Sequence, residues 1–154
     1  MASDETTAAI FMKPVISAAT ARAALRAAAE HAEDIGLAVS IAVVDESGLL
    51  KAFVRQDGAS VISGEMAVDK AFSAVAMGFG VPTNELFNIV KDDLPLAATV
   101  PTRGRLLFLG GGIPIKHDGT VIGAVGVAGG HYEQDIQVAE AAIAAVGAFC
   151  KASS

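Results

Sequence analysis

Two short turns, each built on Asp and Gly between apolar segments, constrain the fold of this chain most strongly. The first, Asp-Glu-Ser-Gly, joins expected strands at 37–45 and 49–55. The second, His-Asp-Gly, joins expected strands at 113–116 and 120–127. Asp and Gly favour tight turns, and alternating apolar residues are typical of half-buried strands. The sequence therefore predicts two β-hairpins and an antiparallel sheet.

The remaining segments predict helices and one further strand. Helical spacing of apolar residues predicts four helices. The first is capped by Ser17 or Thr20 and runs to residue 35, the second begins at Ser60 or Ser63 and runs to about residue 79, and the others span 85–91 and 133–149. Thr83 is expected to cap the third of these, and Gly36 to end the first. Two prolines predict an irregular loop at 94–103. The segment 105–109 is predicted to form a fifth strand. Helices must then cover the sheet, which gives an α/β fold.

Length and composition indicate one domain that assembles with copies of itself. The chain has 154 residues, so we expect a flexible tail at 1–13 and a single domain at 14–154. Although 53% of residues are hydrophobic, the most apolar stretches are far shorter than the ~18 residues of a membrane span. Only 18% are charged. We therefore expect a homo-oligomer and no membrane partner.

Charge and cysteine content narrow the partners and the compartment. The net charge is −6 and no basic cluster occurs, which argues against nucleic acid as a partner. The first residues lack a secretory signal pattern, and the single cysteine, Cys150, has no second thiol to pair with. A cytoplasmic protein is expected.

Six motifs occur together in one order: IAVVD at 41–45, GLLKA at 48–52, RQDGA at 55–59, KAFSA at 70–74, GGGIPI at 110–115 and GTVIGAVGVAGGHYEQD at 119–135. On these motifs the chain resembles the GlcG/HbpS family, also known as haem-degrading-type or DUF336 domains, which includes the C-terminal domain of PduO-type cobalamin proteins. The resemblance covers nearly the whole chain. It implies a profilin-like three-layer α/β/α sandwich with a five-stranded antiparallel sheet. It also implies that the homo-oligomer lies between a dimer and an octamer.

The same resemblance implies two kinds of function, and the chain departs from the family pattern at one position. Some members bind or degrade haem, and the wider family includes cofactor-independent enzymes of aromatic catabolism such as hydroxylaminobenzoate lyases. Where the family usually has Ser before the glycine pair, this chain has Ala128.

Glycines gather on the second hairpin and its ends, at Gly111, Gly112, Gly129 and Gly130. Glycine allows either a ligand or another backbone to approach closely, so these residues are candidates for substrate binding or for tight packing.

Cationic and acidic side chains supply the other candidates. Arg55 is a candidate to grip a carboxylate, and Asp57 a general base or a helix cap. Lys70 is expected on a mainly uncharged helix face. It is a candidate base, a candidate anchor for a carboxylate, or a partner in a surface ion pair. Arg103 and Arg105 are candidates for an anion clamp, in which both side chains bind one anion. Alternatively, they are solvated residues at the start of a strand. The family's fold implies that these cations converge at one pocket mouth.

The chain has three histidines, His31, His117 and His131, without the spacing of a metal site, so no metal ligands are predicted. His131 is a candidate proton carrier, and His31 or His131 a candidate haem ligand.

Three functions remain open. One is a haem- or tetrapyrrole-binding or haem-degrading module. Another is a cofactor-independent, lyase-like enzyme on a small aromatic or hydroxy carboxylic acid, and the third is a structural oligomer. The sequence favours the enzyme, with Lys70, Asp57 or His131 moving protons, because it offers cationic anchors and no paired histidines.

Overall fold

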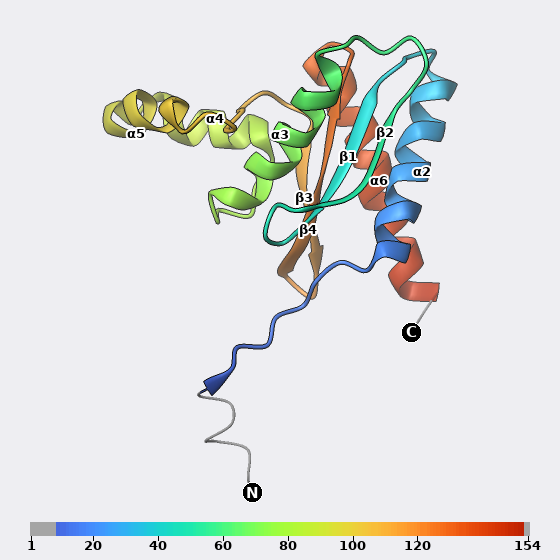
Figure 1. Ribbon diagram of the computed structural model, residues 1–154, viewed down its shortest axis with the longest axis horizontal. Helices are drawn as coiled ribbons and strands as arrows, with labels where there is room; N and C mark the ends of the chain where they lie inside the picture. Colours follow the sequence, from blue (N-terminus) through green and yellow to red (C-terminus); the bar gives the residue numbers. More distant parts are fainter. Residues whose placement is uncertain (1–8, 153–154) are drawn as a thin grey trace, which may run out of the picture.

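Four antiparallel strands form the centre of a computed structural model that describes residues 9–152 (Figure 1). The strands are β1 (Ser40–Asp45), β2 (Leu50–Arg55), β3 (Gly112–His117) and β4 (Thr120–Ala128). They lie in the order β2-β1-β4-β3, so both predicted hairpins are confirmed and are joined by pairing of β1 with β4. The first eight residues of the predicted tail lie outside the described range.

The first hairpin turn is held by the carboxylate of Asp45. It accepts hydrogen bonds from the backbone N–H groups of Ser47 and Leu49, at 2.9 and 3.0 Å. Gly48 follows with a φ of 80°, a conformation that favours glycine. Local side-chain chemistry therefore explains why the chain reverses here.

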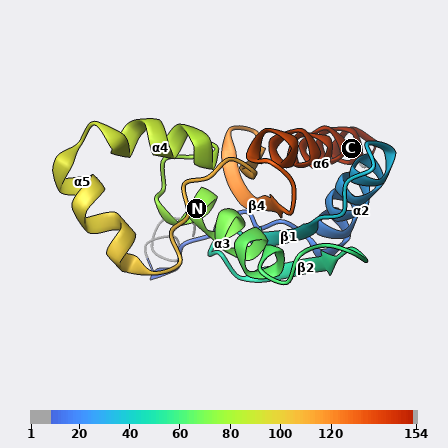
Figure 2. The ribbon, with the colours of Figure 1, turned by 90° about the horizontal axis from the view of Figure 1, so that it is seen from above.

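Helices cover both faces of the sheet, which gives three layers (Figure 2). On one face, α2 (Ala18–Asp34) and α6 (Tyr132–Ala152) pack against each other and against the strands. On the other face, α3 (Ser63–Ala76) crosses β1 and β4. Alternation along β1 sends Ile41 toward α2 and α6 and Ala42 toward α3, so each strand contributes to two cores.

The alanine-rich face of α2 is buried. Ser17 caps this helix, since its Oγ accepts the Thr20 N–H at 3.1 Å, and Ala21, Ala24 and Ala28 are fully buried. Small side chains allow the backbones of α2 and α6 to approach closely. Within residues 9–152, no helix combines the length and the hydrophobicity needed to cross a bilayer.

An arm of short helices extends away from the sheet (Figures 1 and 2). It consists of α4 (Thr83–Lys91), α5 (Leu94–Thr99) and the 3₁₀ helix η1 (Val100–Arg103). The prediction of an irregular loop at 94–103 is therefore wrong. Asp93 caps α5 by accepting the Leu96 N–H at 3.1 Å, and Pro95 lies in the first turn, where proline needs no N–H partner.

The predicted fifth strand at 105–109 does not form, so the five-stranded sheet is corrected to four strands. Side chains from two helices take the hydrogen bonds that a neighbouring strand would make. Ser73 Oγ accepts the Leu107 N–H at 2.7 Å, and Thr83 Oγ1 donates to the Leu109 carbonyl at 2.6 Å. The segment is thereby held beside α3 and α4.

Candidate functional site

A cavity of about 670 Å³ lies between the arm and the body of the domain. We call it the arm cavity. Its lining residues are Asn84, Phe87, Asn88, Leu107, Phe108, Leu109, Gly110 and Tyr132. The walls are thus mainly aliphatic and aromatic, with two amide side chains from α4. Small-molecule sites are typically apolar cavities of about 300–1,000 Å³ with a few polar groups.

Thr83 fixes the start of α4 against the glycine-rich segment. Its side chain is fully buried, and its hydroxyl donates to the Leu109 carbonyl and accepts the Gly112 N–H, the latter at 3.1 Å. Both backbone groups flank the cavity wall at Gly110. One hydroxyl therefore sets the distance between two walls of the arm cavity.

A buried ion pair lies behind the same wall. Lys70 Nζ, from α3, is 2.8 Å from Oδ2 of Asp135 in the first turn of α6. It also donates to the Val127 carbonyl of β4 at 2.9 Å. The side chains of Lys70 and Asp135 are 0% and 2% exposed, so a ligand in solvent does not reach either charge.

Burial favours the neutral forms of both Lys70 and Asp135. Desolvation lowers the pKa of Lys70 and raises the pKa of Asp135, and the hydrogen bond between them opposes both changes. The Gly130 N–H donates to Asp135 Oδ1 at 3.0 Å and further stabilises the carboxylate. Protein groups, and not solvent, therefore stabilise the charges of Lys70 and Asp135.

The predicted glycines lie where other protein atoms approach closely. A Cβ at Gly111 would be 3.0 Å from Lys70 Nζ, and one at Gly112 would overlap the Lys70 carbonyl. A Cβ at Gly129 would be 2.8 Å from the Ala38 carbonyl, and one at Gly130 would be 2.9 Å from a methyl of Leu37. The structure thus gives each glycine a packing role, and ligand contact stays a prediction.

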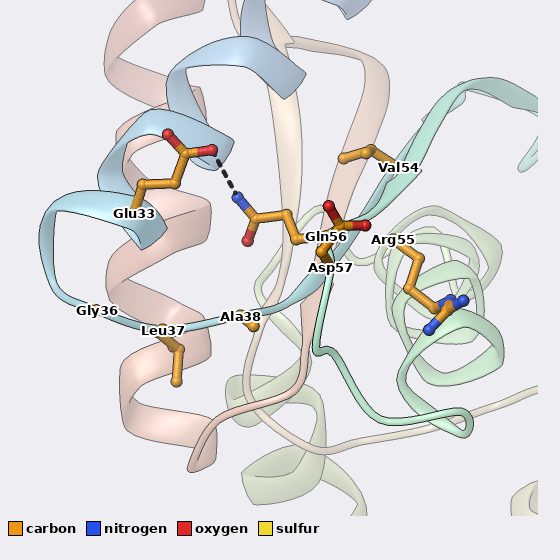
Figure 3. A pocket seen from close by; sticks show the side chains of 8 residues that line it. All are labelled: Glu33, Gly36, Leu37, Ala38, Val54, Arg55, Gln56 and Asp57. Atoms are coloured by element: carbon orange, nitrogen blue, oxygen red, sulfur yellow. Dashed lines mark hydrogen bonds between the residues drawn. The ribbon is translucent and has the colours of Figure 1, made fainter.

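Arg55 and Asp57 share a second, more polar cavity of about 520 Å³, shown in Figure 3. We call it the α2–β2 hollow; Glu33, Gly36, Leu37, Ala38, Val54 and Gln56 complete its lining. Arg55 Nη1 donates to the Ala59 carbonyl at 3.2 Å. The side chains of Arg55 and Asp57 point in different directions, and both residues are exposed.

The arginines of the predicted clamp lie elsewhere. Arg105 forms an exposed ion pair with Asp69, Nε to Oδ1 3.3 Å, and its guanidinium lies 4.0 Å above the Phe72 ring. Arg103 ends η1 and is exposed. Arg55 lines the α2–β2 hollow, Arg105 lines a different cavity beside Asp69, and Lys70 is fully buried.

His131 lies beside the arm cavity. Its ring centroid is 4.2 Å from that of Tyr132, and its side chain is 60% exposed. His31 is in the last turn of α2, and His117 is at the second hairpin turn. Among the described residues, no three His, Cys, Asp or Glu side chains are grouped closely enough to hold a metal ion.

The structure therefore brings Lys70, Gly111 and Gly130 together around Asp135, a residue that the sequence analysis missed. It also missed Tyr132. The prediction that Thr83 caps α4 is wrong, because Pro82 is the N-cap residue and makes no side-chain cap bond, and the Thr83 hydroxyl binds Leu109 and Gly112 instead. One signal for Asp135 was present: a lysine on an apolar helix face needs a buried carboxylate. Spacing along the chain does not identify which of the 17 acidic residues supplies it.

Comparison with protein families gives one match over most of the chain. A family model described as "Haem degrading protein HbpS-like" matches residues 16–144. Among curated proteins, the chain is 36% identical over 122 residues to the corrinoid adenosyltransferase PduO of Salmonella typhimurium. That alignment covers 79% of this chain but 36% of PduO, so the chain corresponds to one part of that longer protein.

Solved structures share the fold over nearly their whole length. Protein ORFY of Klebsiella pneumoniae superposes with a TM-score of 0.82 at 33% identity, covering 90% of this chain and 95% of ORFY. A PduOC–haem complex superposes with a TM-score of 0.77 at 34% identity, covering 85% of this chain and 94% of the other.

Proposed function

This chain belongs to the HbpS-like family of haem-degrading proteins, and on that basis we propose that it binds haem in the arm cavity. A related structure, PduOC, is a haem complex. These relatives support haem more than the carboxylic-acid enzyme that the sequence favoured. The observation that carries the proposal is the apolar, aromatic lining of a cavity of about 670 Å³.

The lining fits a flat, largely apolar macrocycle. Phe87 and Phe108 supply aromatic surface from opposite segments, and Leu107 and Leu109 supply aliphatic surface. Burying such surface is the main source of binding free energy for an apolar ligand. Haem also carries two propionates, which need donors near solvent.

Those donors are available on one face of α4. Asn84 and Asn88 line the cavity, and Lys91 follows at helical spacing on the same face. Amide N–H groups and an ammonium both bind carboxylates. We assign the propionate end to this face.

The iron end is assigned to the start of α6. Phenolate and imidazole both serve as axial ligands of haem iron. Tyr132 is in the cavity lining and His131 lies against it, so these two are the candidate ligands. Bound haem would supply iron for oxygen or electron-transfer chemistry.

Haem titration followed by the Soret band tests the proposal. We expect saturable binding by the wild type and at least tenfold weaker binding by Asn88→Trp, because the indole fills the cavity. Ile89→Trp is the matched control, since Ile89 is an exposed neighbour on α4 outside the lining, and it should bind as the wild type does. Equal binding by both variants would overturn the assignment.

Two further variants identify the ligand. If His131→Ala removes a sharp Soret peak and Tyr132→Phe keeps it, the imidazole is the axial ligand. The opposite result assigns the phenolate. A peak unchanged in both variants contradicts the assignment of the iron end.

A second candidate function is recognition of a small aromatic or hydroxy carboxylic acid in the α2–β2 hollow. It is supported by Arg55 and Asp57, an anchor and a base of the predicted enzyme, which line one cavity. A guanidinium has five N–H donors, and the bond to Ala59 uses one of them. Arg55 thus retains donors for a carboxylate.

Calorimetry with benzoate and glycolate tests this function separately from haem. Arg55→Ala should weaken acid binding about tenfold or more, as expected for loss of a charge-assisted pair. Arg103→Ala, which removes an exposed arginine outside the hollow, serves as control. Equal acid binding by the wild type and both variants would reject an acid site at Arg55.

A further inference from the structure

The Lys70–Asp135 ion pair joins three elements at a place that solvent does not reach. Lys70 comes from α3, Asp135 from the first turn of α6, and the Val127 carbonyl that Lys70 also binds comes from β4. Neither charged side chain lines the arm cavity. Any effect of the pair on a ligand must therefore act through other residues.

Two contacts connect the pair to the wall of the arm cavity. Asp135 is three residues after Tyr132, in the same helical turn, and its Oδ1 accepts the Gly130 N–H just before that turn. On the other side, the Gly111 carbonyl accepts the Val127 N–H at 2.9 Å, so the residue next to Gly110 is bound to the same residue of β4 that Lys70 binds. A Cβ at Gly110 would be 3.4 Å from the Tyr132 ring, so these two wall residues are in close contact.

We infer that the Lys70–Asp135 ion pair is a positioning device that holds Tyr132 and Gly110 in the wall of the arm cavity. This inference rests on the proposed haem function. The pair fixes the first turn of α6 to α3 across β4, and Tyr132 keeps its position because that turn cannot shift. Loss of the pair leaves the fold intact only where no single charge remains buried, since an unpaired buried charge is strongly destabilising.

The appropriate variant therefore removes both charges and keeps the shape. In Lys70→Met/Asp135→Asn, the Asn carbonyl still accepts the Gly130 N–H and Met fills the space of the lysine stem. Glu140→Gln is the matched control, because it removes one carboxylate from α6 at an exposed side chain farther along the helix. Conservative Asp135→Glu keeps the charge and moves it by one methylene.

Tyr132 provides a readout that does not depend on haem. The chain contains one tyrosine and no tryptophan, so the intrinsic fluorescence of the haem-free protein comes from the cavity wall. We expect acrylamide to quench this fluorescence at least twofold more steeply in the double variant than in the wild type. Haem affinity should fall five- to tenfold with a shifted Soret maximum, while Glu140→Gln matches the wild type in both measurements.

The outcomes separate this inference from the proposed function. A folded double variant with wild-type quenching and wild-type haem affinity overturns the positioning role. If the double variant does not fold, the same measurements on Asp135→Glu decide, with wild-type values again overturning the role. Failure of the wild type to bind haem would reject the proposed function, whereas the quenching comparison would still test whether the pair positions Tyr132.

Discussion

The Thr83 hydroxyl lies 2.6 Å from the carbonyl oxygen of Leu109, 26 residues away in sequence, and holds the two segments that face each other across the arm cavity. The same hydroxyl accepts the Gly112 N–H. A single buried side chain thus binds one backbone group in the segment 105–109 and one at the first residue of β3.

Replacing Thr83 by Val should lower the free energy of unfolding by about 1–3 kcal/mol, because the Leu109 carbonyl loses a donor and the Gly112 N–H an acceptor. Urea denaturation measures the change. Thr83→Ser keeps the hydroxyl and should lose less than the Val variant. A Val variant as stable as the wild type would show that these groups find other partners.

Gly126→Ala should destabilise the protein by about 1–3 kcal/mol or more, because α3 passes directly over this position of β4. A Cβ there would overlap the Ala67 carbonyl and lie 2.5 Å from the Ala71 nitrogen. Gly147→Ala, in α6 with open space around it, should instead stabilise by roughly 0.5–1 kcal/mol. Thermal melting of the two variants in opposite directions is the expected result.

The Lys13–Glu46 ion pair predicts a small loss of stability in acid. Lys13 Nζ donates to Glu46 Oε1 at 2.6 Å, and chiefly for this reason, with help from the Ser47 hydroxyl, the pKa of Glu46 lies below its ordinary value. A carboxyl whose pKa is lower in the folded state stabilises above its unfolded pKa, and this contribution disappears as the pH falls through the folded pKa. The contribution should stay below about 1 kcal/mol, because Lys13 is half exposed.

Urea denaturation of the wild type and Glu46→Gln at a series of pH values measures this effect. The difference in unfolding free energy between the two proteins should shrink as the pH falls from about 6 to about 3. A difference that grows toward low pH would contradict the assigned direction of the pKa change.

Self-association remains the expectation for a chain with few charges and prominent apolar side chains. Val61 is 92% exposed and Leu94 79% exposed. Light scattering should give at least twice the monomer mass of 15.5 kDa. A mass of 15.5 kDa throughout the micromolar range would exclude the oligomer.

Local patterns predicted the parts of the fold that local chemistry determines. The Asp45 turn and the Ser17 cap each depend on groups within four residues, so sequence alone locates the first hairpin and the start of α2. The segment at 105–109 has the apolar composition of a strand. Its backbone groups bind Ser73 and Thr83 instead, and that competition arises only in three dimensions.

The candidate site was predictable to a smaller extent for the same reason. Lys70 was identified from its apolar helix face, but its partner Asp135 is 65 residues away. Arg55 and Asp57 share a cavity because Arg55 ends β2 and Asp57 follows it by two residues. Arg103 and Arg105 are just as close in sequence. Arg103 ends the 3₁₀ helix and Arg105 stacks on Phe72, and their joint binding of an anion stays a prediction.

The α5 helix buries none of its residues and lies at the far end of the arm (Figure 1). Extra residues inserted at 94–99 would therefore displace no core side chain and would interrupt no strand pairing. The sheet and its covering helices can keep one architecture while the arm changes in length, so a peptide tag or a fluorescent reporter can be grafted at this point.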